Sequence, residues 1–258
     1  MSGPVTVAPP RGHRWIVAGG LAVLAVSVMA ASFGLLFMLS ADRGYSRSLR
    51  ADAADSTRLK VEAGRAGVTL SPGTDSLVHV YASGDYEQAA PKVAVASSGG
   101  TVTVKSSCQE GCALRLRITV PANLAADVTS SSGEISTSGL GGPLSLRSDS
   151  GQIIVSGSAG PLVLRGGSGT VAVTDSRSRH VTVTGGQGSV RAEFAAPPTS
   201  VEVSTGDGSV DLEMPQDADY SVEAHSGGPT APRISLPVER SSRHAVTVRT
   251  GNGAIQIH

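Results

Sequence analysis

One pattern of apolar and polar positions recurs along the chain. Each repeat reads apolar–any–apolar, then a polar turn that contains a glycine, then apolar–any–apolar again. Apolar residues lie five and seven positions before each turn glycine, as Val128 and Ala126 lie before Gly133. Successive side chains of a strand point to opposite faces, so each apolar–any–apolar segment is predicted to be a short strand with one buried face. The turn glycines of the pattern are Gly100, Gly133, Gly151, Gly169, Gly188, Gly208, Gly227 and Gly253.

The regular spacing of these glycines predicts the architecture. From Gly133 to Gly227 they are 18 to 20 residues apart. A unit of two strands cannot bury its apolar face alone, whereas stacked units can. The sequence therefore predicts an all-β, repetitive β-solenoid of two-strand coils, each of about 19 residues. A β-sandwich of the same strands is the alternative. The recurring glycine is interpreted as a turn position with positive φ.

The pattern is interrupted in two places, around residues 105–113 and 228–243. Between Gly227 and Gly253 the spacing grows to 26 residues, and the segment contains several prolines. Insertions into repeats become surface loops, often on the binding face, so we mark both segments as candidate functional surfaces. Surface insertions without a function are the alternative. The last coil ends at the C-terminus without an obvious cap, so we expect a partner or a second copy of the chain to cover it.

An uncharged, mostly apolar segment at residues 15–41 precedes the repeats. It is long enough to cross a bilayer as a helix. The alternatives are a cleaved signal peptide, whose apolar region would be shorter, and a buried helix of a soluble protein. We therefore predict a cytoplasmic tail at 1–14, a transmembrane helix at 15–41, a juxtamembrane linker at 42–56 and an extracytoplasmic β-repeat domain at 57–258. Flanking arginines do not decide the orientation. The translocation of long downstream domains and the close pair of cysteines favour the domain outside the cell membrane and the N-terminus in the cytoplasm.

A membrane segment followed by repeated V-x-V-x-x-x-x-G-x-V-x-V units resembles the bacterial DUF4097 family, often labelled "putative adhesin" and related to toast-rack domains. The resemblance extends from about Leu59 to the C-terminus. It implies an extracytoplasmic β-solenoid and, for some members, a place in the envelope-stress systems of Gram-positive bacteria. It supplies no catalytic residues.

Motifs for chemistry are weak. The net charge is zero, which gives no indication of nucleic-acid binding. Cys108 and Cys112 are predicted to form a disulfide. The glycine-rich run 166–171 has Val171 where a calcium-binding repeat would need an aspartate. The histidines show no zinc-ligand spacing. No catalytic, cofactor or metal residue is assigned.

Three functions are considered. The first is a membrane-anchored, non-enzymatic, adhesin-like protein that binds or senses a protein or cell-wall partner in the envelope. The second is a structural or accessory subunit of an envelope-stress membrane complex, in which the anchor helix makes the contact. The third is a carbohydrate-active β-helix enzyme, but the sequence lacks the grouped carboxylates that this chemistry uses. A homo-oligomer formed through the C-terminal coil is compatible with the first.

Overall fold

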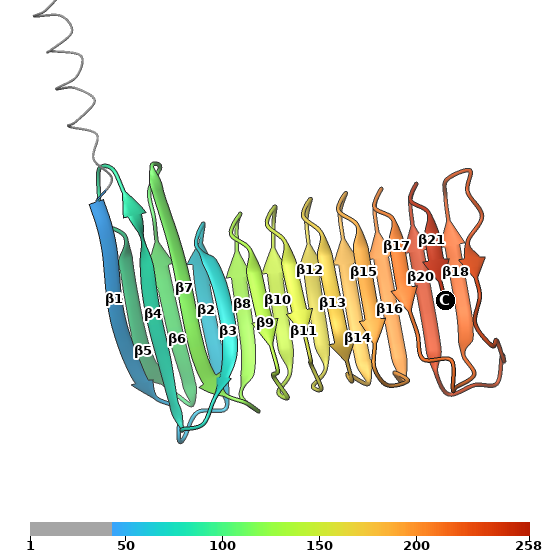
Figure 1. Cartoon of the computed structure of the whole chain (residues 1–258), viewed down its shortest axis with the longest axis horizontal. Helices are drawn as coiled ribbons and strands as arrows, with labels where there is room; N and C mark the ends of the chain where they lie inside the picture. The colour runs from blue at the N-terminus through green and yellow to red at the C-terminus, as the bar shows by residue number, and fades with distance from the viewer. Residues whose placement is uncertain (1–42) are drawn as a thin grey trace, which may run out of the picture. The chain divides into compact units, whose positions relative to one another are not determined.

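The computed structural model describes residues 43–258, which form two long β-sheets with one apolar core between them (Figure 1). One sheet has 11 strands in the order β1-β4-β7-β3-β9-β11-β13-β15-β17-β21-β19, and the other has 10 in the order β18-β20-β16-β14-β12-β10-β8-β2-β6-β5. The strands are β1 (Arg43–Asp52), β2 (Arg58–Gly64), β3 (Gly67–Gly73), β4 (Leu77–Tyr86), β5 (Lys92–Ser98), β6 (Thr101–Ser107), β7 (Cys112–Pro121), β8 (Ala125–Ser130), β9 (Ile135–Ser138), β10 (Leu144–Ser148), β11 (Ile153–Ser156), β12 (Leu162–Gly166), β13 (Val171–Ser176), β14 (His180–Gly185), β15 (Val190–Phe194), β16 (Ser200–Thr205), β17 (Val210–Glu213), β18 (Ser221–Ser226), β19 (Arg233–Ile234), β20 (Ala245–Thr250) and β21 (Ile255–Ile257).

From β8 to β17 the chain alternates between the two sheets, and each strand pairs in parallel with the equivalent strand of the next coil. Equivalent apolar positions therefore form columns, such as Val128, Leu146 and Leu164 in the 10-stranded sheet. These side chains are buried, as are Ile153 and Val171 in the 11-stranded sheet. The prediction of an all-β repeat with two short strands per coil is confirmed as two long, mostly parallel sheets.

The turn glycines are explained by close packing and not by positive φ. A Cβ atom on Gly151 would collide with the carbonyl oxygen of Gly133, and one on Gly169 with that of Gly151. The same contact recurs at Gly188, Gly208 and Gly253, each against the glycine of the neighbouring coil. None of these glycines has a positive φ, so that prediction is wrong for them. The column of stacked turns, which we call the glycine ladder, requires residues without a side chain because adjacent backbones touch there.

A buried hydroxyl closes several of these turns. The amide of Gly151 donates to Ser148 Oγ at 2.9 Å, and the amide of Gly253 donates to Thr250 Oγ1 at 3.0 Å. Thr250 Oγ1 in turn donates to the carbonyl oxygen of Gly208, on the neighbouring coil, at 3.0 Å. Backbone groups that cannot reach water at the turn are therefore satisfied by side chains.

The C-terminal coil does not lie at the end of the stack. Strands β20 and β21 are inserted between β16 and β17 on one side and β18 and β19 on the other (Figure 1). The C-terminal coil is therefore not the uncapped end that the sequence indicated, because the long segment after β18 lets the chain return and place its last strands inside the stack. The sequence pattern aligned Gly227 with Gly253, and this alignment is wrong. Val222 pairs with Val246, and the same register places Pro229, not Gly227, level with Gly253.

The predicted linker at 42–56 is wrong for most of its length. Residues 43–52 form β1, the edge strand of the 11-stranded sheet next to β4. Tyr45, Leu49 and Ala51 are half-buried against the core. Their alternation with arginines and serines is the period-two pattern of a strand, which the high polarity of the segment obscured. The folded unit accordingly begins at Gly44, before the expected start at residue 57.

Gly100 does not belong to the repeat. It follows Gly99 in a two-residue turn between β5 and β6, which pair antiparallel in one sheet. Gly99 and Gly100 have φ values of 56° and 70°, as a tight hairpin turn of the I′ type requires. β4 and β7 also pair antiparallel. The N-terminal end of the molecule therefore contains both parallel and antiparallel strand pairs, whereas the strands of the coils pair in parallel only.

Residues 43–258 include no helix long and apolar enough to cross a membrane. The predicted tail at 1–14 and transmembrane helix at 15–41 lie outside the described residues.

Candidate functional site

Two adjoining hollows lie at the N-terminal end of the 11-stranded sheet and share Ala113 and Arg115. The first has a volume of about 490 Å³ and lies over β1, β4 and β7, with Tyr45, Tyr81 and Asp85 in its lining. The second has a volume of about 460 Å³ and lies over β3 and β7, with Arg117, Gly67 and Glu134 in its lining. We call the two hollows together the arginine groove.

Strand β7 places two arginines on this face. Leu114, Leu116 and Ile118 are buried, so the alternating residues Arg115 and Arg117 point outward and are exposed. They lie two positions apart along the strand, with only Leu116 between them, which corresponds to a rise of roughly 7 Å. On β3, Arg115 pairs with Gly67, which has no side chain and leaves space beside the guanidinium group.

Neither Arg115 nor Arg117 forms an ion pair within residues 43–258, whereas other surface arginines do. Arg147 contacts Asp149 at 2.9 Å, and Arg249 contacts Glu223 at 2.8 Å. A guanidinium group presents its donors in a planar fork that matches a carboxylate or a phosphate. Two such groups on neighbouring outward positions of one strand can therefore contact an anion or successive anionic groups.

Two tyrosines complete the groove. Tyr81 on β4 lies directly opposite Arg117 and is 40% exposed. Its hydroxyl accepts a hydrogen bond from Ser46 Oγ at 3.2 Å. The hydroxyl of Tyr45 is buried and has no hydrogen-bond partner among the described residues. Tyr45 packs against the core, so its shielded hydroxyl is not presented to the hollow.

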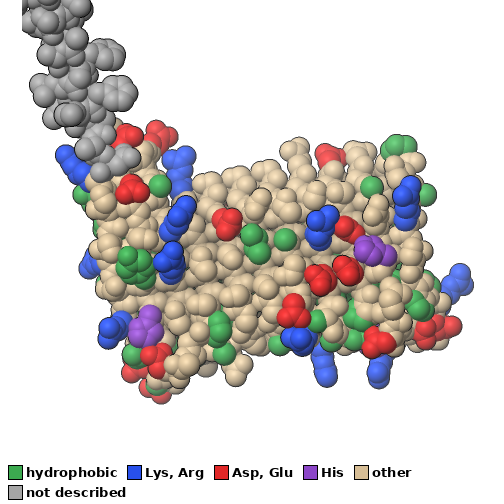
Figure 2. All heavy atoms as spheres, viewed as in Figure 1, with side chains coloured by type: hydrophobic (Ala, Val, Ile, Leu, Met, Phe, Trp, Pro, Cys, Tyr) green, Lys and Arg blue, Asp and Glu red, His purple; other side chains and the backbone are tan. Residues whose placement is uncertain are grey.

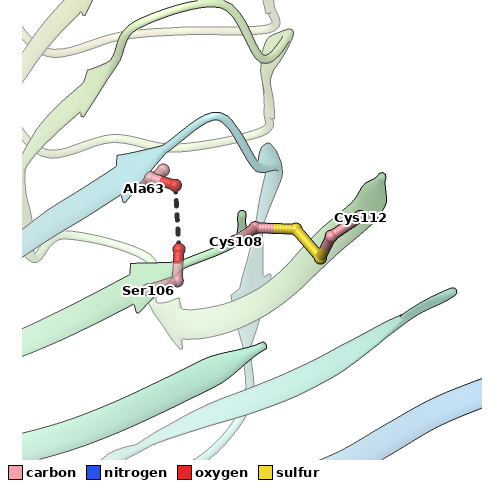
Figure 3. Close-up of a disulfide and its surroundings, with 4 residues drawn as sticks. All are labelled: Ala63, Ser106, Cys108 and Cys112. Carbon is pink, nitrogen blue, oxygen red and sulfur yellow. Dashed lines mark hydrogen bonds between the residues drawn. A yellow bond between two sulfur atoms is a disulfide. The ribbon is translucent and has the colours of Figure 1, made fainter. Parts of the chain in front are cut away.

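A disulfide fixes the corner that leads into β7 (Figure 3). Cys108 follows β6 in one sheet and Cys112 begins β7 in the other, with their Cα atoms 5.7 Å apart. On the same side, Ser106 Oγ donates to the carbonyl oxygen of Ala63 at 2.9 Å (Figure 3). The bridge lies one residue before Ala113, so it holds the strand that carries both groove arginines.

The two candidate surfaces from the sequence are not brought together. Residues 105–107 belong to β6, residues 108–111 form the corner that the disulfide closes, and residues 112 and 113 begin β7 beside the arginine groove. Residues 228–243 lie at the opposite end of the stack, around β19. Sequence reasoning missed Arg115, Arg117 and Tyr81. The alternation Leu-Arg-Leu-Arg-Ile at residues 114–118 predicts two outward arginines on a strand. It does not predict which residues of the neighbouring strands lie opposite them.

Basic and acidic side chains are interspersed on the face shown in Figure 2, both at the end that holds β1 to β7 and over the last coils, and a histidine lies near each end. In those coils the charges contact one another: Asp211 contacts Arg191 Nε at 3.3 Å and His258 Nε2 at 3.1 Å. Near the groove end, a hydrogen bond from His79 lowers the pKa of Asp75. Residues 43–258 hold no group of three His, Cys, Asp or Glu side chains suited to a metal ion.

Stacked two-strand coils with a glycine ladder define a two-sheet β-solenoid. The family model described as Toastrack DUF4097 matches residues 122–258, more than half of the chain, and the chain belongs to this family. The predicted family is thus confirmed.

Solved structures of similar fold include a "putative adhesin" from Bacteroides fragilis, which is 13% identical; the match covers 85% of this chain and 99% of that chain, with a TM-score of 0.49. A "putative cell adhesion protein" from Clostridium sporogenes is 12% identical over 83% of this chain and 99% of that chain, with a TM-score of 0.45. At such identities the likeness concerns the fold alone. No curated protein matches the sequence.

Proposed function

We propose that this protein is a non-enzymatic, adhesin-like binding protein and that the arginine groove binds an anionic polymer of the cell envelope. The observation that carries the proposal is the pair Arg115 and Arg117, which are exposed, form no ion pair within the described chain and are fixed on one strand. A polymer with a phosphate or carboxylate on each unit could contact both guanidinium groups.

The construction of the groove favours binding. Its walls are strands whose opposite faces pack into the core, so the arginines are presented on a rigid scaffold. A rigid site loses little conformational entropy when a ligand binds. Tyr81 adds an exposed ring beside Arg117, on which a sugar or other flat group could pack.

We further propose that residues 15–41 anchor the protein in the cell membrane, with the N-terminus in the cytoplasm and the β-domain outside. The uncharged apolar segment supports the anchor. The bridge between Cys108 and Cys112 supports an oxidising compartment. Because β1 begins at Arg43, the folded domain follows this segment directly.

The test is co-sedimentation of residues 43–258, which contain the whole two-sheet core, with isolated Gram-positive cell walls. We expect saturable binding that weakens as salt is added, because the contacts are between charges. The double variant Arg115→Gln/Arg117→Gln should bind roughly tenfold or more weakly, the equivalent of about 1.4 kcal/mol.

The matched control is Arg147→Gln/Arg165→Gln, which removes two neighbouring arginines from the other sheet. This variant should bind like the unmodified protein. Walls stripped of their anionic polymers should lose the binding. Equal sedimentation of both double variants, or undiminished binding to stripped walls, would overturn the proposal.

A further inference from the structure

The end of the stack farthest from the arginine groove has an open strand edge. β18 is the last strand of the 10-stranded sheet and pairs only with β20. A segment after β19 covers the edge at one point: the amide of Tyr220 donates to the carbonyl oxygen of Pro237 at 3.0 Å, and the amide of Glu239 donates to that of Tyr220 at 2.9 Å. Beyond Tyr220, no strand of the described chain adjoins β18 on this side.

The direction of the backbone groups follows from these bonds. The amide of Tyr220 points outward, while that of Ser221 points the other way, to the carbonyl oxygen of His244 at 2.8 Å. Backbone groups alternate along a strand, so Val222, Ala224 and Ser226 share the outward direction of Tyr220. Their amide and carbonyl groups form a short edge that can accept another strand.

The side chains of β18 are complementary to those of a second β18 in antiparallel orientation. A two-fold axis at Ala224 places Ala224 opposite its own copy and Val222 opposite Ser226, all with outward backbone groups. It also places the exposed side chains of Glu223 and His225 opposite each other. Arg249, the neighbour of His225 on β20, already contacts Glu223 at 2.8 Å, so each Glu223 would lie between two basic residues.

We propose that β18 pairs antiparallel with β18 of a second copy of this chain, so that the two 10-stranded sheets become one continuous sheet across a two-fold axis. The pairing satisfies the open edge and covers the half-buried side chains of Val222 and Ala224. It would also place the two arginine grooves at the two far ends of the dimer. A polymer or wall surface could then be held at two points, which strengthens attachment without any new contact.

Cysteine crosslinking tests both the pairing and its register. The full chain carries Glu223→Cys or His225→Cys and is oxidised mildly in membranes or detergent. Residue 223 lies opposite residue 225, within the Cα separation that a disulfide spans, whereas two copies of residue 223 are about 8 Å apart, beyond that limit. The native cysteines are already joined to each other. We expect disulfide dimers from the mixture of the two variants and few from either variant alone.

A second variant tests the edge itself. Ala224→Pro removes an outward amide and leaves the bonds to β20 in place, and proline is tolerated on edge strands. In the background of the two cysteine variants it should abolish the crosslink, whereas Ala224→Ser, which keeps the amide, should not. The absence of dimers from the mixture, or equal crosslinking of each variant alone, would overturn the proposal, and wall binding by the arginine groove would be unaffected.

Discussion

Two parts of the molecule contribute to the same two sheets but differ in how their strands pair. They are the coils from β8 to β17 and the N-terminal part from β1 to β7. In the coils every strand has an equivalent neighbour in the same register, and the same turn recurs. The N-terminal part contains antiparallel pairs, a tight hairpin turn and a disulfide, and it carries the arginine groove. The family match also begins near this boundary, at residue 122. The regular part of the fold provides length and rigidity, and the irregular part provides the distinctive surface.

The sharpest test of this contrast compares two glycines. In Gly188→Ala the new Cβ collides with the backbone of Gly169 on the next coil, and the neighbouring strands cannot move apart without breaking the stack. In Gly99→Ala the Cβ meets open space, and only the left-handed φ is unfavourable. We expect the free energy of unfolding to fall by roughly 3 kcal/mol or more for Gly188→Ala and by about 1 kcal/mol for Gly99→Ala.

Urea denaturation followed by far-ultraviolet circular dichroism measures both changes. Similar losses for the two variants would show that the glycine ladder is not the constraint that sets the coil geometry.

A smaller effect is expected at the disulfide. The double variant Cys108→Ser/Cys112→Ser frees a short loop, for which the loop-entropy model gives about 2 kcal/mol. Hydrogen exchange should increase at the β6–β7 corner and remain unchanged in the coils, because the bridge acts only on the N-terminal part. Reduction of the unmodified protein should reproduce the pattern. Exchange that rises equally in β12 and β14 would contradict this division.

The smallest effect concerns an exposed ion cluster on β2 and β6. Hydrogen bonds from Lys60 and Lys105 lower the pKa of Glu62. A carboxyl group whose pKa is lower in the folded state stabilises the fold above its unfolded pKa, and this contribution is lost as pH falls through the folded pKa. Glu62→Gln should therefore be slightly less stable than the unmodified protein at pH 7 but not at pH 3, as judged from urea midpoints. Glu202→Gln, at an exposed position in the coils, is the control.

Much of the coil structure was predictable from sequence, because the period of two within strands and the repeat between them report the same buried columns. Apart from Gly100 and Gly227, the turn glycines were identified correctly but explained wrongly, since a sequence does not distinguish a positive φ from a close approach of two backbones. β1 was missed because its apolar residues Tyr45, Leu49 and Ala51 are separated by polar side chains that are also typical of a linker. The groove was out of reach for another reason. Its geometry depends on the pairing of Tyr81 with Arg117, residues far apart in sequence and joined by a register that no local pattern specifies.

The position of the C-terminal coil has a consequence for how the chain is made. A solenoid whose coils follow the sequence could close progressively as the nascent chain emerges. Here the outermost coil, with β18 and β19, has no neighbour until β20 and β21 arrive and fit between it and β16 and β17. That end of the molecule can therefore assemble only after residues 245–257 have been synthesised. A premature stop codon just before residue 245 would remove the coil of β20 and β21. The coil of β18 and β19 would then have no neighbouring strands to pair with, although its sequence would be intact.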